Sequence, residues 1–218
     1  MRNAHVASAV AVLLTLSGCG AKTADYSSIW TTPGSSTETT KEDTPKERPV
    51  PIAEFLAGLG VTGEQVPLDK LTDLTVTLPR PAGWTKYSNT NFSPGTEAIA
   101  RNNTYPTAMV LVFKLSGNFD VAEALTHADA DAELSKDFKK LNSSTDDFKG
   151  FPSSMIEGSY DMQGTRLHTY NRIVIPVTPA PVFQRYLVQF TVTTLADQAA
   201  AAAPAVQQVI SGFDVAVR

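Results

Sequence analysis

The sequence predicts an α+β fold, an antiparallel β-sheet with helices packed on both faces, and three observations predict it. Residues 107–115 are almost entirely apolar, which is typical of a central strand covered on both faces. Strand patterns at 154–162 and 165–175 are joined by the tight turn Met162-Gln163-Gly164, so these strands run antiparallel. An alanine-rich segment, 196–210, has high helix propensity. Sheet and helices bury their apolar faces against each other, which gives a layered domain.

The elements before the central strand are marked by prolines, glycines and apolar periodicity. Residues 51–59 predict a short helix that begins at a proline and ends before Gly60. Residues 74–78 alternate between apolar and polar side chains and predict a strand. Residues 79–84 predict a turn that ends on a tryptophan, and 97–102 predict the next strand.

The elements after the central strand continue the alternation of helix and strand. Residues 121–138 predict one amphipathic helix, with Asn118 or Asp120 as its N-cap. Residues 182–192 predict a strand with large apolar side chains on one face. In the last helix, Pro204 must either kink the helix or begin its second half.

The N-terminus has the pattern of an export signal. A basic start, Met1-Arg2-Asn3, precedes a short and mostly apolar run, Val6–Leu16. A membrane-spanning helix needs about 20 apolar residues, so this run is too short to span a bilayer. It ends in Leu-Ser-Gly-Cys, which looks like the lipobox of bacterial lipoproteins, where the cysteine receives a diacylglycerol and an N-acyl group. We therefore predict that residues 1–18 are a lipoprotein signal peptide and that Cys19 is lipidated.

Lipidation of Cys19 has consequences for chemistry and for location. Cys19 is the chain's one cysteine, so the mature protein keeps no thiol for a disulfide, a metal site or a nucleophile. Each buried methylene contributes roughly 0.8 kcal/mol, so two or three acyl chains hold the protein on a bilayer. We expect the protein on the extracytoplasmic side of the cell membrane, in the cell envelope.

Residues 19–50 predict a disordered tether between the lipid and the domain. The segment is rich in Ser, Thr, Pro, Lys and Glu, and it has too few apolar residues to offset the ordering of the chain, about 1–2 kcal/mol per residue. It is a plain spacer or, given its threonines and prolines, an O-glycosylated one. Residues 51–218 are long enough for one globular domain with a sizeable core.

Charge and motifs argue against several function classes. The chain has 18 Lys+Arg against 22 Asp+Glu and no basic cluster, so we expect no nucleic-acid partner. Residues 58–63 have the spacing G-x-G-x-x-G but follow a predicted helix, so a helix stop explains them and we expect no cofactor. His127 lies near Asp129, Asp131 and Glu133, where we expect a solvated helix face rather than a metal site.

The candidate ligand or partner surface is a row of basic and aromatic side chains on one strand face, joined by an arginine from the neighbouring strand. These residues are Arg166, His168, Tyr170, Arg172 and Arg185. Such a row can bind a phosphate, sulfate or carboxylate head group, or the acidic patch of a partner. The alternative is the outward polar side of an amphipathic strand, paired with Asp161 or Glu157.

Taken together, these segments resemble a known family. The lipobox, the tether, the stretches IAEFLAGLGVT, LPRPAGW and YPTAMVLVFKLSG, and the alanine-rich last helix are similar to the mycobacterial LpqN/LpqT lipoproteins, and within them to the LpqT type. The resemblance covers essentially the whole chain. It implies a PsbP-like α/β/α sandwich and a link to the binding and trafficking of long-chain envelope lipids alongside membrane exporters. It implies no defined reaction and no binding residues.

Two function classes are left open. The first is a non-enzymatic, membrane-anchored domain that binds mycolate-type envelope lipids in a groove between sheet and helix, which a cavity of about 300–1,000 Å³ would favour. The second is a protein-interaction module for envelope or host proteins, with the Arg166–Arg172 face as its surface. A secreted hydrolase is a remote alternative, because no G-x-S-x-G, S-x-x-K or H-E-x-x-H motif occurs.

Overall fold

The computed structural model describes residues 48–218, so the predictions for the signal peptide, for Cys19 and for most of the tether lie outside the described residues. The helices are α1 Ile52–Gly58, α2 Val121–Leu125, α3 Ala130–Glu133 and α4 Ala199–Gly212, with 3-10 turns at Leu68–Lys70 and Ala196–Gln198. The strands are β1 Thr62–Gln65, β2 Leu74–Thr77, β3 Trp84–Lys86, β4 Glu97–Arg101, β5 Thr104–Ser116, β6 Lys139–Ser144, β7 Ser153–Met162, β8 Thr165–Val174, β9 Arg185–Leu195 and β10 Asp214–Val217.

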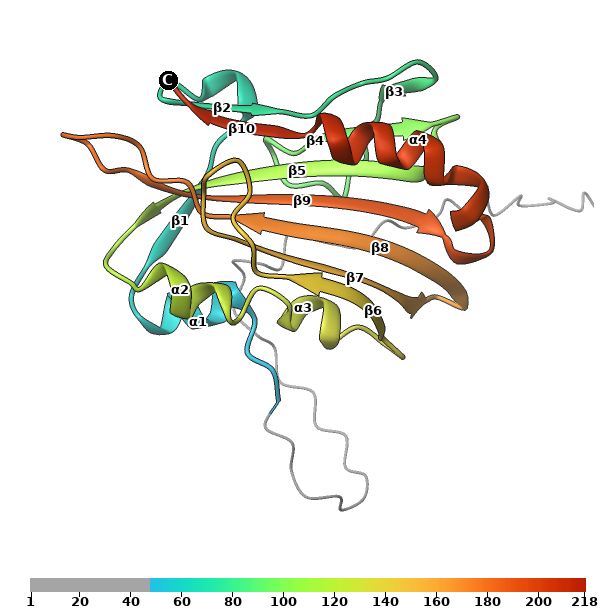
Figure 1. Cartoon of the computed structure of the whole chain (residues 1–218), viewed down its shortest axis with the longest axis horizontal. Coiled ribbons are helices and arrows are strands. Elements are labelled where there is room, and N and C mark those ends of the chain that lie inside the picture. Colours follow the sequence, from blue (N-terminus) through green and yellow to red (C-terminus); the bar gives the residue numbers. More distant parts are fainter. Residues whose placement is uncertain (1–47) are drawn as a thin grey trace, which may run out of the picture.

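Most of these strands form one large antiparallel sheet (Figure 1). Its strand order is β3-β4-β5-β9-β8-β7-β6, and β1 pairs with the end of the long strand β5, beyond the part that pairs with β4. A second sheet of two strands joins β10 to β2. The predicted α+β class with an antiparallel sheet is confirmed.

The centre of the large sheet is the pair β5–β9. Residues 108–113 of β5 and 186–194 of β9 are buried on both faces, as the apolar run in β5 predicts. Their register places Val110 opposite Phe190 and Val112 opposite Val188. Cross-strand pairs of β-branched and aromatic side chains stabilise a sheet, so these contacts fix the register between β5 and β9.

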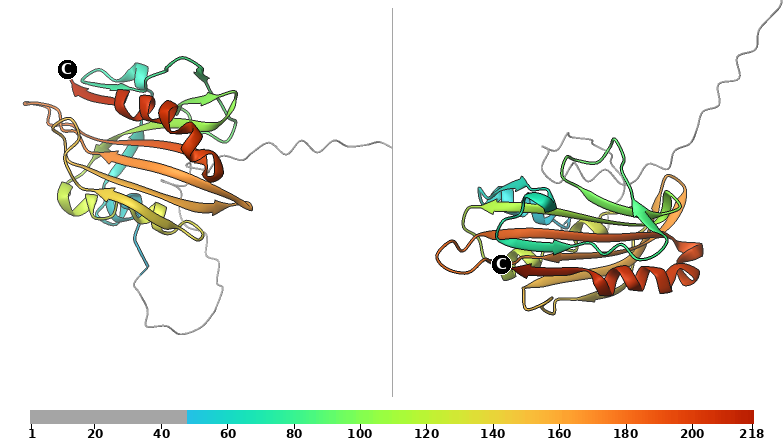
Figure 2. Two further views of the ribbon diagram at one scale, coloured as in Figure 1. Left: turned by 45° about the vertical axis from the view of Figure 1, so that its right-hand side comes forward. Right: turned by 90° about the horizontal axis from the view of Figure 1, so that it is seen from above.

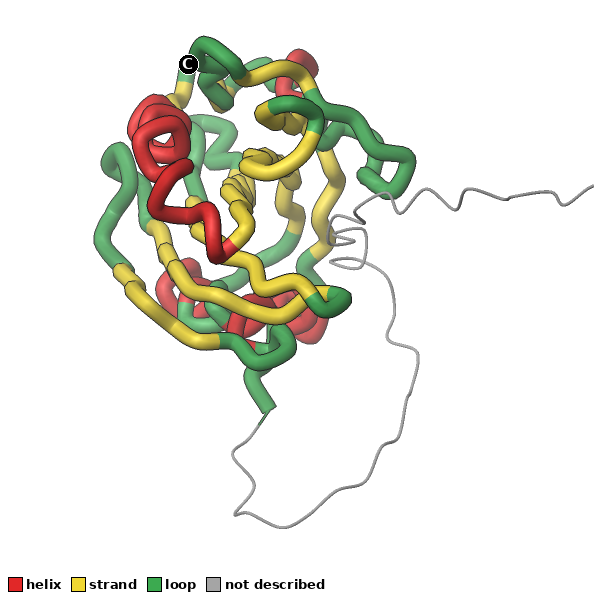
Figure 3. The backbone as a smooth tube through the Cα atoms, turned by 90° about the vertical axis from the view of Figure 1, so that its right-hand side faces the viewer, coloured by secondary structure: helices red, strands yellow, loops and turns green. Residues whose placement is uncertain are grey.

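Helices cover both faces of this sheet, as predicted. Helix α4 and the small sheet lie on one face, around a core that contains Trp84, Phe190, Val209 and Phe213. Helices α1 and α2 lie on the other face, around a core that contains Leu56 and other apolar side chains. Figures 1 and 2 show α4 and the α1–α3 group at opposite borders of the molecule with the sheet between them, and Figure 3 shows the curved sheet from its end.

The predicted tight turn between β7 and β8 is present. Gln163 and Gly164 have positive φ values of 50° and 81°. Two consecutive positive φ values are typical of the two-residue hairpin turn whose twist matches that of the flanking strands. The turn therefore sets the register that pairs Met162 with Thr165.

The predicted single helix at 121–138 is wrong. Helix α2 ends at Leu125, and Thr126 turns back to donate a hydrogen bond from its Oγ1 to the carbonyl oxygen of Glu123 at 2.6 Å. A short helix α3 follows, and Asp137 then takes a positive φ of 53° before β6 begins. The backbone N–H groups of His127 and Ala128 donate to the carbonyl oxygens three residues before them, at 3.1 and 3.2 Å, so a tight turn interrupts the helix between α2 and α3.

Several short elements were missed, and one predicted strand begins later than expected. Strands β1, β3, β6 and β10 have three to six residues each and owe their pairing to distant partners. Strand β9 begins at Arg185, so residues 182–184 belong to the loop before it. Helix α4 continues through Pro204, which lies inside it and is exposed. No helix within residues 48–218 has the length and apolar character needed to cross a membrane.

Candidate functional site

The row of side chains predicted on the strand at 165–175 does share one face of β8. Tyr170 packs edge-on against Phe190 with ring centroids 6.0 Å apart, so the row projects on the α4 side of the sheet. The ε nitrogen of Arg172 donates to the Tyr170 hydroxyl at 2.9 Å, and its guanidinium lies 4.8 Å from the Phe148 ring centroid. The Arg172 end of the row is therefore packed against aromatic rings.

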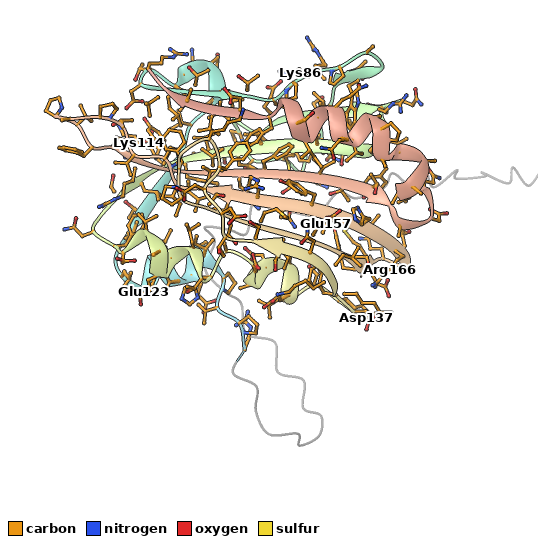
Figure 4. The ribbon with its side chains drawn as sticks, viewed as in Figure 1. Lys86, Lys114, Glu123, Asp137, Glu157 and Arg166 are labelled. Atoms are coloured by element: carbon orange, nitrogen blue, oxygen red, sulfur yellow. The ribbon has the colours of Figure 1, made fainter. Side chains whose placement is uncertain are left out.

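The other basic side chains of this face lie against carboxylates. Arg166 donates to Asp161 at 2.9 Å, and this hydrogen bond holds the pKa of the Asp161 carboxyl below its ordinary value. The Nε2 atom of His168 lies 3.1 Å from a Glu157 carboxylate oxygen. Figure 4 shows Arg166 close to Asp137, whose carbonyl oxygen accepts a further hydrogen bond from the same guanidinium at 2.9 Å. These pairings match the alternative interpretation of the row, the polar side of an amphipathic strand.

Arg185 does not join this row. Strand β9 pairs Arg185 with Leu115 and Leu187 with Phe113, and these apolar partners belong to the core beneath helices α1 and α2. Because directly paired residues project from the same side of a sheet, Arg185 points to the α2 side, opposite to Arg172. The expectation that Arg185 adds to the row is wrong: Val188 of β9 pairs with Val174, which shares the face of Arg172, and Arg185 lies three residues before Val188 and so on the other face.

Arg185 instead lines an open hollow of about 760 Å³ between α2 and the segment before β7. Its lining is Phe119, Asp120, Val121, Ala122, Leu125, Thr126, Thr145, Asp147, Pro152, Ser153 and Arg185. This volume lies in the range of small-molecule sites in proteins. A second cavity, beneath the β3–β4 loop beside Tyr87 and Phe92, measures about 20 Å³ and is too small for an organic ligand.

The apolar wall of the hollow comes from α2 and the residues before it. Asp120 caps this helix by accepting a hydrogen bond from the backbone N–H of Glu123 at 2.8 Å. The capped helix presents Val121 and Leu125 to the sheet, where both are partly buried against the core. The cap therefore fixes the wall on which an apolar ligand chain can lie.

The polar group of the hollow is the Arg185 guanidinium, which lies 5.1 Å from the Phe119 ring centroid. Within residues 48–218 it makes no ion pair. Asp120 and Asp147 add negative charge at the rim. The hollow thus combines an apolar wall with one cation and two carboxylates, and it can hold an amphipathic molecule whose polar end meets Arg185.

His127 and its acidic neighbours have structural roles. The Nδ1 atom of His127 lies 3.0 Å from the carbonyl oxygen of Val50, and its ring stacks on Phe55 at 4.1 Å. Asp129 accepts a hydrogen bond from Ser154 at 3.0 Å, and burial raises the pKa of its carboxyl. Residues 48–218 contain no cluster of three metal-ligating side chains. The histidine holds the start of the domain against α1.

Comparison with known proteins shows the family. Residues 48–216 match the family model described as probable lipoprotein LpqN. The chain belongs to the LpqN lipoprotein family. The family predicted from the lipobox and the quoted stretches is therefore confirmed, and LpqN-family members are named as lipoproteins.

Two relatives and one solved structure give the extent of the similarity. The putative lipoprotein LpqT of Mycobacterium tuberculosis H37Rv is 51% identical over 219 residues, which cover 100% of this chain and 96% of LpqT. LpqT of Mycobacterium leprae is 45% identical over 213 residues, 97% of this chain and 95% of its own. The crystal structure of LpqN, a protein involved in cell envelope biogenesis of M. tuberculosis, matches with a TM-score of 0.66 and 19% identity over 76% of this chain and 97% of LpqN, and this likeness shows the fold.

A groove between sheet and helix was expected for one of the two function classes, but of the residues that line this hollow only Arg185 was among the predicted site residues. Its α2 wall lies inside the segment that was assigned to one long helix, whose apolar side chains were treated as core. Its other wall, near Thr145 and Asp147, meets α2 only in the folded chain. A usable signal existed in Phe119-Asp120, an aromatic residue followed by a helix cap just after a buried strand.

Proposed function

We propose that the domain is a non-enzymatic binding domain that holds an envelope lipid in the hollow beside α2, with the lipid chain on α2 and its anionic or hydroxylated head at Arg185. The observation that carries this proposal is the Arg185 guanidinium, which faces an apolar wall and has no carboxylate partner in the described part of the chain. A hydrogen bond from a guanidinium to a carboxylate or phosphate is among the strong ones. Anchoring through Cys19 keeps the domain at the membrane from which such a lipid comes.

The arrangement of the histidines supports a binding rather than a hydrolytic role. A serine hydrolase needs a histidine within hydrogen-bond reach of its serine. His168 pairs with Glu157, and His127 pairs with the Val50 carbonyl oxygen. The protein-interaction alternative has less support, because the basic side chains of the β8 face already contact carboxylates or pack on aromatic rings.

Ligand binding can be tested by filling the hollow. Ala122 is an exposed residue of α2 in its lining, so Ala122→Trp places a large side chain there. We expect this variant to bind a dansyl-labelled long-chain fatty acid at least about tenfold more weakly, because the chain loses most of its apolar contact. Ala203→Trp is the matched control, since Ala203 is an exposed alanine of α4 on the opposite face. Equal affinity of the two variants would overturn the proposed site.

The role of Arg185 can be tested with two probes of equal chain length. We expect Arg185→Gln to weaken binding of a long-chain fatty acid about tenfold or more, because a charge-assisted hydrogen bond contributes roughly 1.5–3 kcal/mol. The corresponding fatty alcohol should bind both proteins nearly equally. Loss of affinity for both probes alike would show that Arg185 shapes the hollow and does not bind the head group.

A further inference from the structure

The loop between β8 and β9 carries five consecutive exposed apolar residues. Residues 179–183, Pro-Ala-Pro-Val-Phe, are all exposed, and Val182 and Phe183 keep 68% and 64% of their surface accessible. Residues 175–184 contain no charged side chain. A contiguous exposed apolar run of this length is avoided on soluble surfaces unless it contacts another molecule. Figures 1 and 2 show this loop extending beyond the ends of the strands.

The loop is held in one conformation by hydrogen bonds at its base. The backbone N–H of Thr178 donates to the Gln184 carbonyl oxygen at 2.9 Å, and the Gln184 N–H donates to the Thr178 hydroxyl at 2.9 Å. The Gln184 side chain donates to the Leu115 carbonyl oxygen at 2.7 Å, which ties the loop to β5. The apolar tip is therefore pre-organised, so little backbone freedom is lost when it binds.

Phe183 has an unusual backbone conformation for a large side chain. Its φ of 48° lies in the left-handed region, which bulky L residues rarely adopt. Its ring points into solvent although a buried position would be favourable. A strained and exposed aromatic residue at a loop tip is typical of a contact site.

We propose that the tip formed by residues 179–183 docks onto the lipid bilayer and inserts the side chains of Val182 and Phe183 among the lipid head groups. This proposal concerns how the domain lies on the membrane and does not depend on the ligand proposed for the hollow. Both sites are adjacent, because Arg185 follows the loop directly.

The size and chemistry of the tip favour a bilayer over a protein partner. A stable protein interface needs about 20–30 residues on each side, whereas this tip has five. The tip also offers no charged side chain to select a particular protein. A lipidated domain is already concentrated at the membrane, so the weak affinity of a small apolar tip is sufficient there.

The chain outside the described part is long enough for this contact. Cys19 and Arg48 are 48 − 19 = 29 residues apart. At about 3.3–3.6 Å per residue their maximum separation is on the order of 100 Å. The anchor therefore lets the domain turn its β8–β9 end toward the bilayer.

The charged residues near the tip lie at its base and not within it. Lys114 lies near the loop in Figure 4, and its register partner on β1 is Glu64. Arg185, two residues after Phe183, packs on Phe119 in the hollow beside α2. Docking should therefore depend on apolar burial, with little effect of salt and no requirement for anionic lipid.

A fluorescent label at the tip tests the proposal on the full lipidated chain in phosphatidylcholine vesicles. Because Cys19 is the native chain's one cysteine and acylation occupies its thiol, Val182→Cys can be labelled selectively with the environment-sensitive dye NBD. The mass of the unlabelled protein verifies acylation beforehand. We expect a blue-shifted emission that nitroxide-bearing lipids quench, at low and at high salt alike.

Leu141 provides the matched control, since it keeps 64% of its surface exposed on β6, as Phe183 does on the tip. A label at Leu141→Cys should stay in water. With the label at position 182, Phe183→Ser should lower the ratio of docked to undocked protein about tenfold, as expected for the loss of one buried aromatic side chain, whereas Leu141→Ser should not. An unshifted label at position 182 would overturn the proposal. So would a shift that appears only in native envelope membranes, because it would identify a protein partner.

Discussion

Two arginines show how much a residue's function depends on its exact environment. Arg172 and Arg185 lie on neighbouring strands, yet one packs on Phe148 and bonds to the Tyr170 hydroxyl, while the other faces an open hollow. Removing Arg172 would therefore disturb packing, whereas Arg185 is available to a ligand. From residue type alone, both arginines were equally good candidates for the ligand or partner surface.

A buried tyrosine makes a testable contribution to stability. The Tyr186 hydroxyl donates to the Asp73 carboxylate at 2.6 Å, and burial together with this bond raises the pKa of the tyrosine well above its ordinary value of 10.0. We expect Tyr186→Phe to lower the free energy of unfolding by about 1–2 kcal/mol at neutral pH, because a hydrogen bond to a charged group is lost. Urea unfolding at pH 7 measures this change.

The same tyrosine predicts a pH dependence. Above pH 10 the unfolded chain releases the Tyr186 proton and the folded chain keeps it, so the stability that this group contributes falls as pH rises. Tyr186→Phe removes this part of the alkaline loss, and the difference between the two proteins should shrink as pH rises through 10. Parallel pH profiles of the two proteins would contradict the role of the Tyr186–Asp73 bond.

At the scale of elements, the segment after α3 is fixed by close packing against β7. A Cβ atom at Gly158 would lie 2.5 Å from the Phe138 ring and 2.7 Å from the Lys139 carbonyl oxygen. Only glycine allows Phe138 to cross the strand at this point. Phe138 is the last residue of the predicted long helix, and β6 begins directly after it at Lys139.

A pair of glycine substitutions tests this packing. We expect Gly158→Ala to lower the free energy of unfolding by about 1–3 kcal/mol, because the added methyl group displaces the ring or the backbone. Gly58→Ala is the control: a Cβ there meets nothing within 4 Å in the last turn of α1. That substitution should be neutral or stabilise by up to about 1 kcal/mol. Thermal unfolding of both variants measures the contrast, and similar values would contradict the packing argument.

At the scale of the whole molecule, the layered domain is preceded by Cys19, the residue predicted to carry the lipid, which lies 29 residues before Arg48. We expect Cys19→Ala to move the protein from the membrane fraction to the soluble fraction, because the acyl chains are its main attachment. The domain should fold as before, since Cys19 lies outside residues 48–218. Fractionation and circular dichroism measure the two effects. A variant that stayed fully membrane-bound would contradict the lipid anchor.

The proposed docking tip and the predicted anchor would act together at this scale. The anchor alone would leave the orientation of the domain free, whereas a second apolar contact at residues 179–183 would fix which end faces the bilayer. The hollow beside α2 would then lie close to the membrane surface, where a lipid can enter it. Orientation is therefore the property that links the two proposals.

The sequence by itself determined the features that depend on neighbouring residues. The lipobox, the tight turn at Gln163-Gly164, the buried run in β5 and the last helix are written in consecutive residues, and so is the family. Backbone conformation, periodicity and propensity act over a few positions, so these predictions needed no tertiary information.

Only the tertiary structure decided which distant segments meet. It paired β10 with β2, turned Arg185 away from Arg172, and formed the hollow between α2 and the segment before β7. Long-range pairing depends on how whole apolar faces fit together, and a strand residue changes face with each step along the chain. For this reason the basic row on β8 could be predicted from the sequence. The hollow beside α2, where Arg185 makes no ion pair within residues 48–218, became visible only in the fold.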